Sequence, residues 1–168
     1  QRFDTVVSID SSKAIVMQEA VKAGASFIND VRALREPGAL EAASALQVPV
    51  CLMHMQGQPR SMQGSPEYQN VVAEVSTFLQ ERIDACVEAG ISKSQIVIDP
   101  GFGFGKNLEH NYQMLEGLSD FHCLGVPLLA GMSRKSMLGQ LLGRDVDERL
   151  AGSIVVAAIA AQKGAQII

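Results

Sequence analysis

The sequence predicts an α/β fold built on a parallel sheet. Short apolar runs rich in β-branched residues alternate with longer helical segments, and no low-complexity linker interrupts the alternation. The short runs are apolar throughout, which is typical of strands buried on both faces, and helical crossovers between them imply parallel pairing. Two architectures fit this pattern: an incomplete (β/α)8 barrel, and a complete doubly wound sheet of five or six strands.

Each element follows from its local pattern. Strands are predicted at residues 5–9, 26–28, 48–53, 95–98 and 126–129. Helices are predicted at residues 13–22, 39–46, 68–89, 108–118, 135–142 and 148–162. The long segment 68–89 is expected to cover the sheet, because its apolar residues form one stripe between charged positions.

Three predicted helices end in a glycine. Gly24, Gly90 and Gly164 each stand where a left-handed backbone conformation would end a helix. A strand follows the first two glycines, and residues 166–168 are expected to open a sixth strand after the third. Because a strand also opens the chain with no helix before it, we predict a single domain over residues 1–168 that lacks both ends of a barrel.

Composition and charge argue against several classes of function. The 168 residues are 47% hydrophobic and 19% charged, as in ordinary globular proteins. No apolar run approaches the ~20 residues of a membrane span, and no leader is expected at residues 1–4. A net charge of −4, with no Trp and two Tyr, argues against a nucleic-acid partner, which needs a basic face and aromatic platforms. A small anionic ligand is not excluded.

The three cysteines are scattered along the chain. Cys51, Cys86 and Cys123 show no C-x-x-C spacing and are odd in number. They are expected to be reduced core thiols of a cytoplasmic protein, and to form neither a zinc site nor a disulfide framework.

Polar side chains stand where the predicted strands end. Asp10, Asn29, His54 and Asp99 each follow an apolar run, and residues 131–135 follow the last one. The carboxyl ends of parallel strands meet at one edge, where ligands bind in barrels and in open sheets alike. Any one of these residues could be a helix cap or a turn former. Five consecutive strand ends together predict a site.

The histidines carry a weaker signal. His54 stands at a strand end, but we favour a satisfied structural role for it over a role in the site. His110 and His122 are expected to face solvent. Met53, on a predicted strand, is placed to contact a ligand at the same edge.

A glycine-rich segment follows the fourth predicted strand. Residues 99–106 read Asp-Pro-Gly-Phe-Gly-Phe-Gly-Lys, which matches neither the G-x-G-x-x-G dinucleotide fingerprint nor the phosphate-binding P-loop. The glycines allow the backbone to approach a flat ligand closely, and Phe104 offers a packing face. The alternative is a flexible loop that binds no ligand.

A basic pair opens the helix after the fifth predicted strand. Ser133 is a natural N-cap, and Arg134 and Lys135 place positive charge at the positive end of the helix dipole. That placement costs about a few tenths of a kcal/mol or more. We therefore expect both side chains to pair with carboxylates or to bind an anionic or electron-rich ligand.

Four segments, in order along the chain, carry a resemblance to a known family. Residues 27–31 (Phe-Ile-Asn-Asp-Val), 50–55 (Val-Cys-Leu-Met-His-Met), 99–106 and 131–136 (Gly-Met-Ser-Arg-Lys-Ser) together resemble bacterial dihydropteroate synthase. The likeness runs from residue 1 to residue 168. It implies a (β/α)8 TIM barrel of which this chain carries about strands three to seven and the start of the eighth.

The resemblance implies a transferase of folate biosynthesis and a role for each site residue. Such an enzyme condenses 6-hydroxymethyl-7,8-dihydropterin diphosphate with 4-aminobenzoate, uses Mg²⁺, and is the target of sulfonamides. Asp10 would stabilise positive charge that develops on the ring, and Lys135 would contact both substrates; these two are the expected catalytic residues. The pterin would be bound by Asp10, Asn29, Met53, Asp99, Gly103, Phe104, Gly131 and Lys135. The 4-aminobenzoate would be bound by Phe104, Lys135 and Ser136.

The resemblance also places several expected features outside residues 1–168. They are the metal-binding Asn, the mobile loops that close over 4-aminobenzoate, and the Arg and His that hold diphosphate. We therefore expect no metal ligand within this chain, negligible synthase activity from it alone, and a homodimer in the intact protein. Two alternatives stay open: a pterin-binding module without turnover, and a related pterin-barrel methyltransferase.

Overall fold

A computed structural model describes residues 5–57 and 66–168 of the chain. The strands are β1 (Ser8–Asp10), β2 (Phe27–Asp30), β3 (Val50–Met53) and β4 (Ile96–Asp99). The α-helices are α1 (Ala14–Lys22), α2 (Ala39–Leu46), α3 (Val71–Glu88), α4 (Leu108–Glu116), α5 (Ser136–Leu142) and α6 (Leu150–Gln162). Three 3-10 segments are η1 (Lys93–Gln95), η2 (Leu118–Leu124) and η3 (Val146–Glu148). Strands and helices alternate through β4, as predicted.

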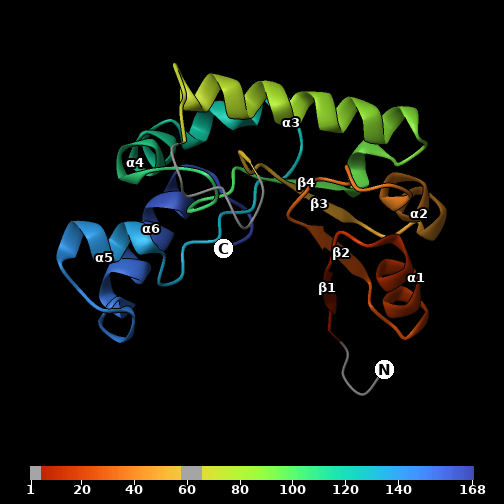
Figure 1. The fold of residues 1–168 in the computed structure, drawn as a ribbon, viewed down its shortest axis with the longest axis horizontal. Coiled ribbons are helices and arrows are strands. Elements are labelled where there is room, and N and C mark those ends of the chain that lie inside the picture. Colours follow the sequence, from red (N-terminus) through yellow and green to blue (C-terminus); the bar gives the residue numbers. More distant parts are fainter. Residues whose placement is uncertain (1–4, 58–65) are drawn as a thin grey trace.

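The sheet is parallel, and its strands follow one another in chain order. The order is β1-β2-β3-β4, and every pairing is parallel. A doubly wound sheet reverses its strand order at a switch point, and the described strands show no such reversal. Figure 1 shows α1, α2 and α3 on the outside of the strands, with α4, α5 and α6 beyond β4.

The predicted strand at residues 126–129 is reduced to two isolated pairings. Leu128 pairs with Ile98, and Leu129 pairs with Ile167, both in parallel. The reason lies in Pro127, whose carbonyl oxygen accepts from the Ile98 N–H at 2.9 Å but which has no N–H to donate. The ladder is therefore interrupted, although the chain continues the sheet in the same order. The pairing of Leu129 with Ile167 adds residues 166–168 to the sheet, where a sixth strand was predicted.

The three glycines predicted to end helices do so. Gly24, Gly90 and Gly164 have φ values of 112°, 92° and 94°, in the left-handed region. The backbone N–H of the residue after each glycine donates to a carbonyl in the last turn of the helix, for example from Ile91 to Cys86 at 2.9 Å. These are Schellman ends, which explains why glycine spacing located the helix ends so closely.

The starts of α1, α3, α5 and α6 and the exposure of one cysteine differ from expectation. Helix α3 begins at Val71 and not at residue 68, because the Asn70 side chain accepts from the Ala73 N–H at 3.1 Å and caps it. Helix α5 begins at Ser136, and no side chain caps it, so Ser133 is not its N-cap. Cys51 and Cys86 are buried free thiols as expected, but Cys123 is exposed on η2 and is not a core residue.

The sheet has an apolar outer face and an inner face that mixes polar and apolar side chains. Side chains alternate along each strand, so residues two apart share a face. One set packs with the helices in the core: Ile28, Val50, Leu52, Ile96 and Ile98. The intervening set points away from this core: Asp10, Asn29, Cys51, Met53, Val97 and Asp99. In the outer set, Asp30 is the exception, because its buried carboxylate accepts from the N–H groups of Arg32 and Leu34, each at 2.8 Å, and holds the turn after β2.

Candidate active site

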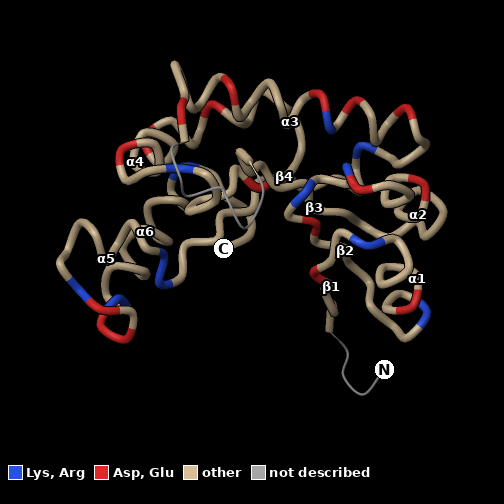
Figure 2. The backbone as a smooth tube through the Cα atoms, viewed as in Figure 1, with Lys and Arg blue, Asp and Glu red and all other residues tan. Residues whose placement is uncertain are grey.

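Strand register brings the predicted site residues into two rows. Asp10 on β1 stands opposite Asn29 on β2, which stands opposite Cys51 on β3. One step nearer the carboxyl edge, Met53 on β3 stands opposite Asp99 on β4. All five side chains lie on the inner face, and Figure 2 shows acidic positions at the ends of the central strands among mostly uncharged backbone.

Asp10 and Asn29 form a hydrogen-bonded pair. The Asn29 Nδ2 donates to Asp10 Oδ2 at 3.2 Å, and Asp10 is exposed while Asn29 is half-buried. Burial raises the pKa of the neighbouring Cys51 thiol, and the Asp99 and Asp10 carboxylates raise it further. Both carboxylates therefore lie close enough to Cys51 to raise the pKa of its thiol.

Asp99 is the buried carboxylate of the site. It is 8% exposed, and its Oδ1 accepts from the Gly101 N–H at 2.7 Å. Burial raises the pKa of Asp99 to about 6, against the hydrogen bond from Gly101 and the positive charges of Lys135 and Lys106. The side chain is thus mostly a carboxylate at neutral pH, held in a place with little water.

Lys135 and Phe104 face each other at the mouth of the site. The Lys135 Nζ lies 4.6 Å from the centre of the Phe104 ring, in cation–π geometry. Burial lowers the pKa of Lys135, and Asp99 opposes that shift. Gly103, with φ of 82°, passes beneath the lysine stem, where an added Cβ would lie 3.4 Å from Lys135 Cδ.

The glycine-rich loop packs directly on the chain that follows β3. Gly101 and Gly105 have φ values of 74° and 60°, and a Cβ at either would overlap a backbone oxygen, that of His54 or Gln56 respectively. On the other side of the loop, the Tyr68 hydroxyl donates to the Gly105 carbonyl at 2.8 Å. Gly101 and Gly105 are therefore required by close approach to the protein's own backbone. Close approach of this loop to a flat ligand stays a prediction.

The turn before α5 is held by α6. Arg134 has φ of 50°, its N–H donates to Ser153 Oγ at 2.8 Å, and its carbonyl accepts from Arg149 Nη1 at 3.1 Å. The Arg134 side chain lies 3.9 Å from the exposed carboxylate of Asp147. Arg134 thus has a carboxylate partner, as expected for one member of the basic pair, while Lys135 turns toward Asp99 and Phe104.

The remaining predicted residues take up different positions. Met53 is 3% exposed, and Gly131 follows the pairings at Leu128 and Leu129 with open space where a Cβ would be. Ser136 is exposed at the first position of α5. It lines a pocket of about 200 Å³ together with Pro66, Lys106, Asn107, Leu108, Asn111, Met137 and Gln140.

The sequence-based predictions gave no role to Lys106, the last residue of the glycine-rich segment 99–106. Its ammonium is buried and lies 3.0 Å from His54 Nδ1. Burial and the positive charges of Lys106 and Arg35 lower the pKa of His54 to about 3, so the imidazole is neutral and accepts from the lysine. His54 also meets the Phe78 ring edge-on at 4.9 Å. The satisfied structural role favoured for His54 is confirmed.

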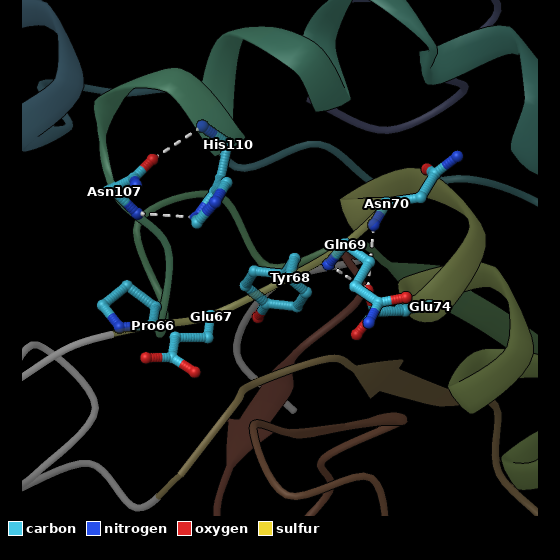
Figure 3. Close-up of a pocket in the computed structure, with 8 residues that line it drawn as sticks. All are labelled: Pro66, Glu67, Tyr68, Gln69, Asn70, Glu74, Asn107 and His110. Carbon is cyan, nitrogen blue, oxygen red and sulfur yellow. Dashed lines mark hydrogen bonds between the residues drawn. The ribbon is translucent and has the colours of Figure 1, made fainter.

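His110 and His122 differ from each other in exposure. His110 is half-buried in the capping box of α4, with Asn107, and its ring meets Tyr68 at 4.9 Å. Figure 3 shows this pair beside a larger open pocket. The expectation that His110 faces solvent was wrong, because the helix cap recruits its side chain. His122 is exposed as expected, with its Nε2 3.0 Å from the Lys163 carbonyl.

Residues 5–57 and 66–168 contain neither a cluster of metal ligands nor a membrane-spanning helix. No group of three or more His, Cys, Asp or Glu side chains there is arranged to hold a metal ion. No helix there is long and apolar enough to cross a membrane.

The fold and site define an α/β protein that carries polar side chains at the carboxyl edge of a parallel sheet. Comparison with known proteins gives a narrower result. Residues 1–168 match the family described as pterin binding enzyme. The chain therefore belongs to the pterin-binding enzyme family.

Dihydropteroate synthases from several bacteria are similar to this chain over nearly its whole length. It is 56% identical to the dihydropteroate synthase of Haemophilus influenzae over 99% of its length, and 56% identical to that of Escherichia coli K12 over 100%. A Yersinia pestis dihydropteroate synthase solved with a sulfonamide drug superimposes with a TM-score of 0.98 at 57% identity, covering 100% of this chain. The chain spans 61%, 60% and 61% of these three proteins, respectively.

Proposed function

We propose that this chain supplies the pterin-binding part of a dihydropteroate synthase. That enzyme joins 6-hydroxymethyl-7,8-dihydropterin diphosphate to 4-aminobenzoate to give 7,8-dihydropteroate and diphosphate. The observation that carries the proposal is one inner face that presents Asp10, Asn29 and Asp99 beside Lys135 and Phe104. Related enzymes support it: a Xanthomonas albilineans dihydropteroate synthase, 50% identical, was solved with 7,8-dihydropteroate and also with 4-aminobenzoic acid.

The sheet fits a sector of an eight-stranded barrel. Parallel strands that follow one another in chain order, with helices on the outside and polar side chains at the carboxyl ends of the strands, are the arrangement of a (β/α)8 barrel. We assign β1 to the third barrel strand and residues 166–168 to the start of the eighth. Residues 1–168 are proposed to lie in one domain.

The pterin ring would be bound by charge-assisted hydrogen bonds and flat packing. A pterin carries an N–H and an amino group side by side, and the Asp99 carboxylate can accept both. Asn29 can donate and accept at neighbouring ring atoms. Phe104 and Met53 would contact the ring faces, and the open space at Gly131 and the missing side chain of Gly103 would let the ring approach the backbone.

The chain's residues would act on the ring charge and on the nucleophile. In the reaction the C–O bond to diphosphate breaks, a C–N bond to the arylamine forms, and the amine loses a proton. The amine is neutral and nucleophilic at neutral pH, so no strong base is needed. Asp10 would stabilise positive charge that develops on the pterin. Lys135 and Ser136 would position 4-aminobenzoate, together with Phe104.

No group of three or more His, Cys, Asp or Glu side chains within residues 5–57 and 66–168 is arranged to hold a metal ion. We propose that the protein ligand of the magnesium ion lies outside this chain. No step above passes through the ion. Assignment of Mg²⁺ to the reaction and of the protein to the cytoplasm stay predictions.

A homodimer is supported by exposed apolar side chains on α5, α6 and the turn between them. We define the α5–α6 apolar patch as Leu141, Leu142, Val146, Leu150, Ile154 and Val155, all more than 40% exposed. Helix α6 is apolar on nearly all sides, which is typical of a helix that is covered.

An assay with both substrates tests the proposed function. The chain is incubated with dihydropterin diphosphate, 4-aminobenzoate and Mg²⁺, and dihydropteroate is measured by chromatography; pterin binding is measured by calorimetry in parallel. Binding that Asp99→Asn abolishes supports the proposal, and the rate then tests the expectation that these residues alone turn over little. Binding without turnover would favour the binding-module alternative. Transfer of a methyl group from a methyl-folate would favour the methyltransferase, which the segments 99–106 and 131–136 argue against.

A further inference from the structure

Lys106 is a buried cation whose three hydrogen-bond acceptors all belong to the protein. It is 4% exposed, and its Nζ lies 3.0 Å from His54 Nδ1, 3.1 Å from the Gly101 carbonyl and 3.0 Å from the Phe104 carbonyl. An ammonium has three protons to donate, so these contacts satisfy it. Burying an ammonium among neutral acceptors is nevertheless costly, and an apolar side chain would fill the same space with no desolvation penalty. The stability of the fold alone does not explain a lysine here.

The contacts of Lys106 fix the glycine-rich loop at two points. The Gly101 and Phe104 carbonyls lie on either side of Gly103, and the Lys106 ammonium holds both. Asn111, 2% exposed, completes the closure: its Oδ1 accepts from the Gly103 N–H at 2.7 Å, and its Nδ2 donates to the Lys106 carbonyl at 3.3 Å. The loop is therefore tied from beneath by two buried side chains.

The loop in turn positions the groups that would meet the ligand. Phe104 lies against Lys135, and Gly103 lies beneath the Lys135 stem. Outside the loop, the Tyr68 hydroxyl donates to the Gly105 carbonyl at 2.8 Å. A shift of the Phe104 carbonyl would move its ring, and with it the contact surface at the mouth of the site.

We propose that Lys106 is a positioning residue of the pterin site: it acts through the glycine-rich loop, whose carbonyls it holds so that Phe104 and Lys135 are arranged to bind the ligand. This inference rests on the proposed function. It assigns a task to a lysine that is distinct from Lys135 and that the site residues inferred from the sequence did not include.

The charges around Lys106 give this role a pH dependence. The ionisable groups that face it are His54 after β3, Asp99 at the end of β4 and Lys135 before α5. Burial lowers the pKa of Lys106 to about 7, against the attraction of Asp99 and with a small further lowering by Lys135. A neutral amine donates two hydrogen bonds and not three, so the loop loses one tie as the pH rises through about 7.

Calorimetric titration with 6-hydroxymethylpterin tests the proposal. Lys106→Met keeps the length of the side chain but cannot donate, and Lys22→Met, at an exposed position of α1, is the matched control. We expect Lys106→Met to fold and to bind at least about tenfold more weakly than wild type, as loss of about one or two net hydrogen bonds implies. The affinity of wild type should decline above pH 7, and that of Lys106→Met should not. The ratio of wild-type to variant affinity cancels the titration of the ligand itself. A purely structural lysine would lower the melting temperature without changing this ratio's pH profile.

A second measurement needs no ligand. The chain has no Trp, so Phe104→Trp introduces a single indole at the loop. Acrylamide should quench this fluorescence more strongly when Lys106→Met is added, and no more strongly when Lys22→Met is added. Equal quenching, or equal pterin affinity of Lys106→Met and wild type, would overturn the proposal. If wild type binds no pterin, the proposed function fails, and the quenching result still decides the role of Lys106. Should Lys106→Met not fold, Lys106→Gln, which keeps two amide protons, takes its place in both measurements.

Discussion

At the scale of single residues, three buried ionisable groups with opposed pKa shifts lie together at the strand ends. Burial raises the pKa of Asp99 to about 6 and lowers those of Lys106 and His54 to about 7 and about 3. Each shift disfavours a charge that water would otherwise stabilise. At neutral pH the group holds one carboxylate, one lysine near its midpoint and one neutral imidazole. Such clusters are typical of functional sites.

The His54 shift predicts a pH-dependent stability. The unfolded chain protonates His54 below about pH 6.5, whereas the folded chain does so only near pH 3. Between those values the unfolded state binds one proton more, so this residue makes the free energy of unfolding fall by up to about 1.4 kcal/mol for each pH unit lowered. Asp99 acts in the opposite sense between about pH 3.8 and 6, because there the folded state holds the extra proton.

The comparison of wild type with His54→Asn isolates that contribution. Asn can still accept from Lys106 but does not titrate. We expect the variant to be less stable at pH 7, from the lost contact with Phe78, and the difference from wild type to shrink as the pH falls from 6.5 to 4. Urea unfolding at several pH values measures it. A difference that stays constant over this range would show that His54 is not held neutral.

At the scale of elements, the glycine-rich loop depends on backbone that no side chain can replace. A Cβ at Gly101 would overlap the His54 carbonyl oxygen, and the φ of 74° adds strain for any other residue. Gly131 offers the matched control, since a Cβ there would meet nothing within 4 Å. The two glycines stand in neighbouring strand-end loops but differ in what surrounds them.

We therefore expect Gly101→Ala to lower the free energy of unfolding by more than about 2 kcal/mol, from left-handed strain and backbone overlap together. Gly131→Ala should change it by less than about 0.5 kcal/mol. Thermal or urea unfolding of both variants gives the comparison. Equal stabilities would mean that the loop does not pack against residue 54 as described.

The sequence predicted elements well where one local signal decides them. Glycine at C′ located the ends of α1, α3 and α6, and the spacing of Val71, Val75, Leu79 and Ile83 predicted the buried stripe of α3. It failed where a tertiary partner decides. Ser133 has the chemistry of an N-cap, but α5 begins only at Ser136. The turn before α5 is held by tertiary partners: the Arg134 N–H donates to Ser153 Oγ, and Arg149 Nη1 donates to the Arg134 carbonyl. No local pattern contains those partners.

At the scale of the whole molecule, the α5–α6 apolar patch is the surface through which we expect the proposed homodimer to form. If the proposed homodimer forms through this patch, Ile154→Glu should weaken it. Ile15→Glu is the control, because Ile15 on α1 is equally exposed (63% against 61%) and lies outside the patch. Analytical ultracentrifugation should show a dimer for wild type and Ile15→Glu, and a monomer for Ile154→Glu. A wild-type monomer at every concentration tested would remove the support for the dimer.

The parallel sheet followed from the apolar runs and the helical crossovers between them. Period-two alternation places Asp10, Asn29 and Asp99 on the inner face, away from the apolar residues that pack on the helices. His54, one residue beyond β3, packs against Phe78 instead. The pattern could not decide between a barrel sector and a doubly wound sheet, because strand order is a tertiary property. Lys106 was missed for the same reason: a lysine after a glycine-rich segment does not reveal that His54, which follows another strand, will accept its hydrogen bond.

The most direct test of the central claim is calorimetric titration of the chain with 6-hydroxymethylpterin, comparing wild type with Asp99→Asn and with the exposed-site control Asp120→Asn. We predict one pterin per chain for wild type and for Asp120→Asn. Asp99→Asn should bind at least about tenfold more weakly, as loss of a charged hydrogen bond of about 1.5–3 kcal/mol implies. A folded wild-type chain that binds no pterin, or an Asp99→Asn variant that binds as tightly as wild type, would contradict the account.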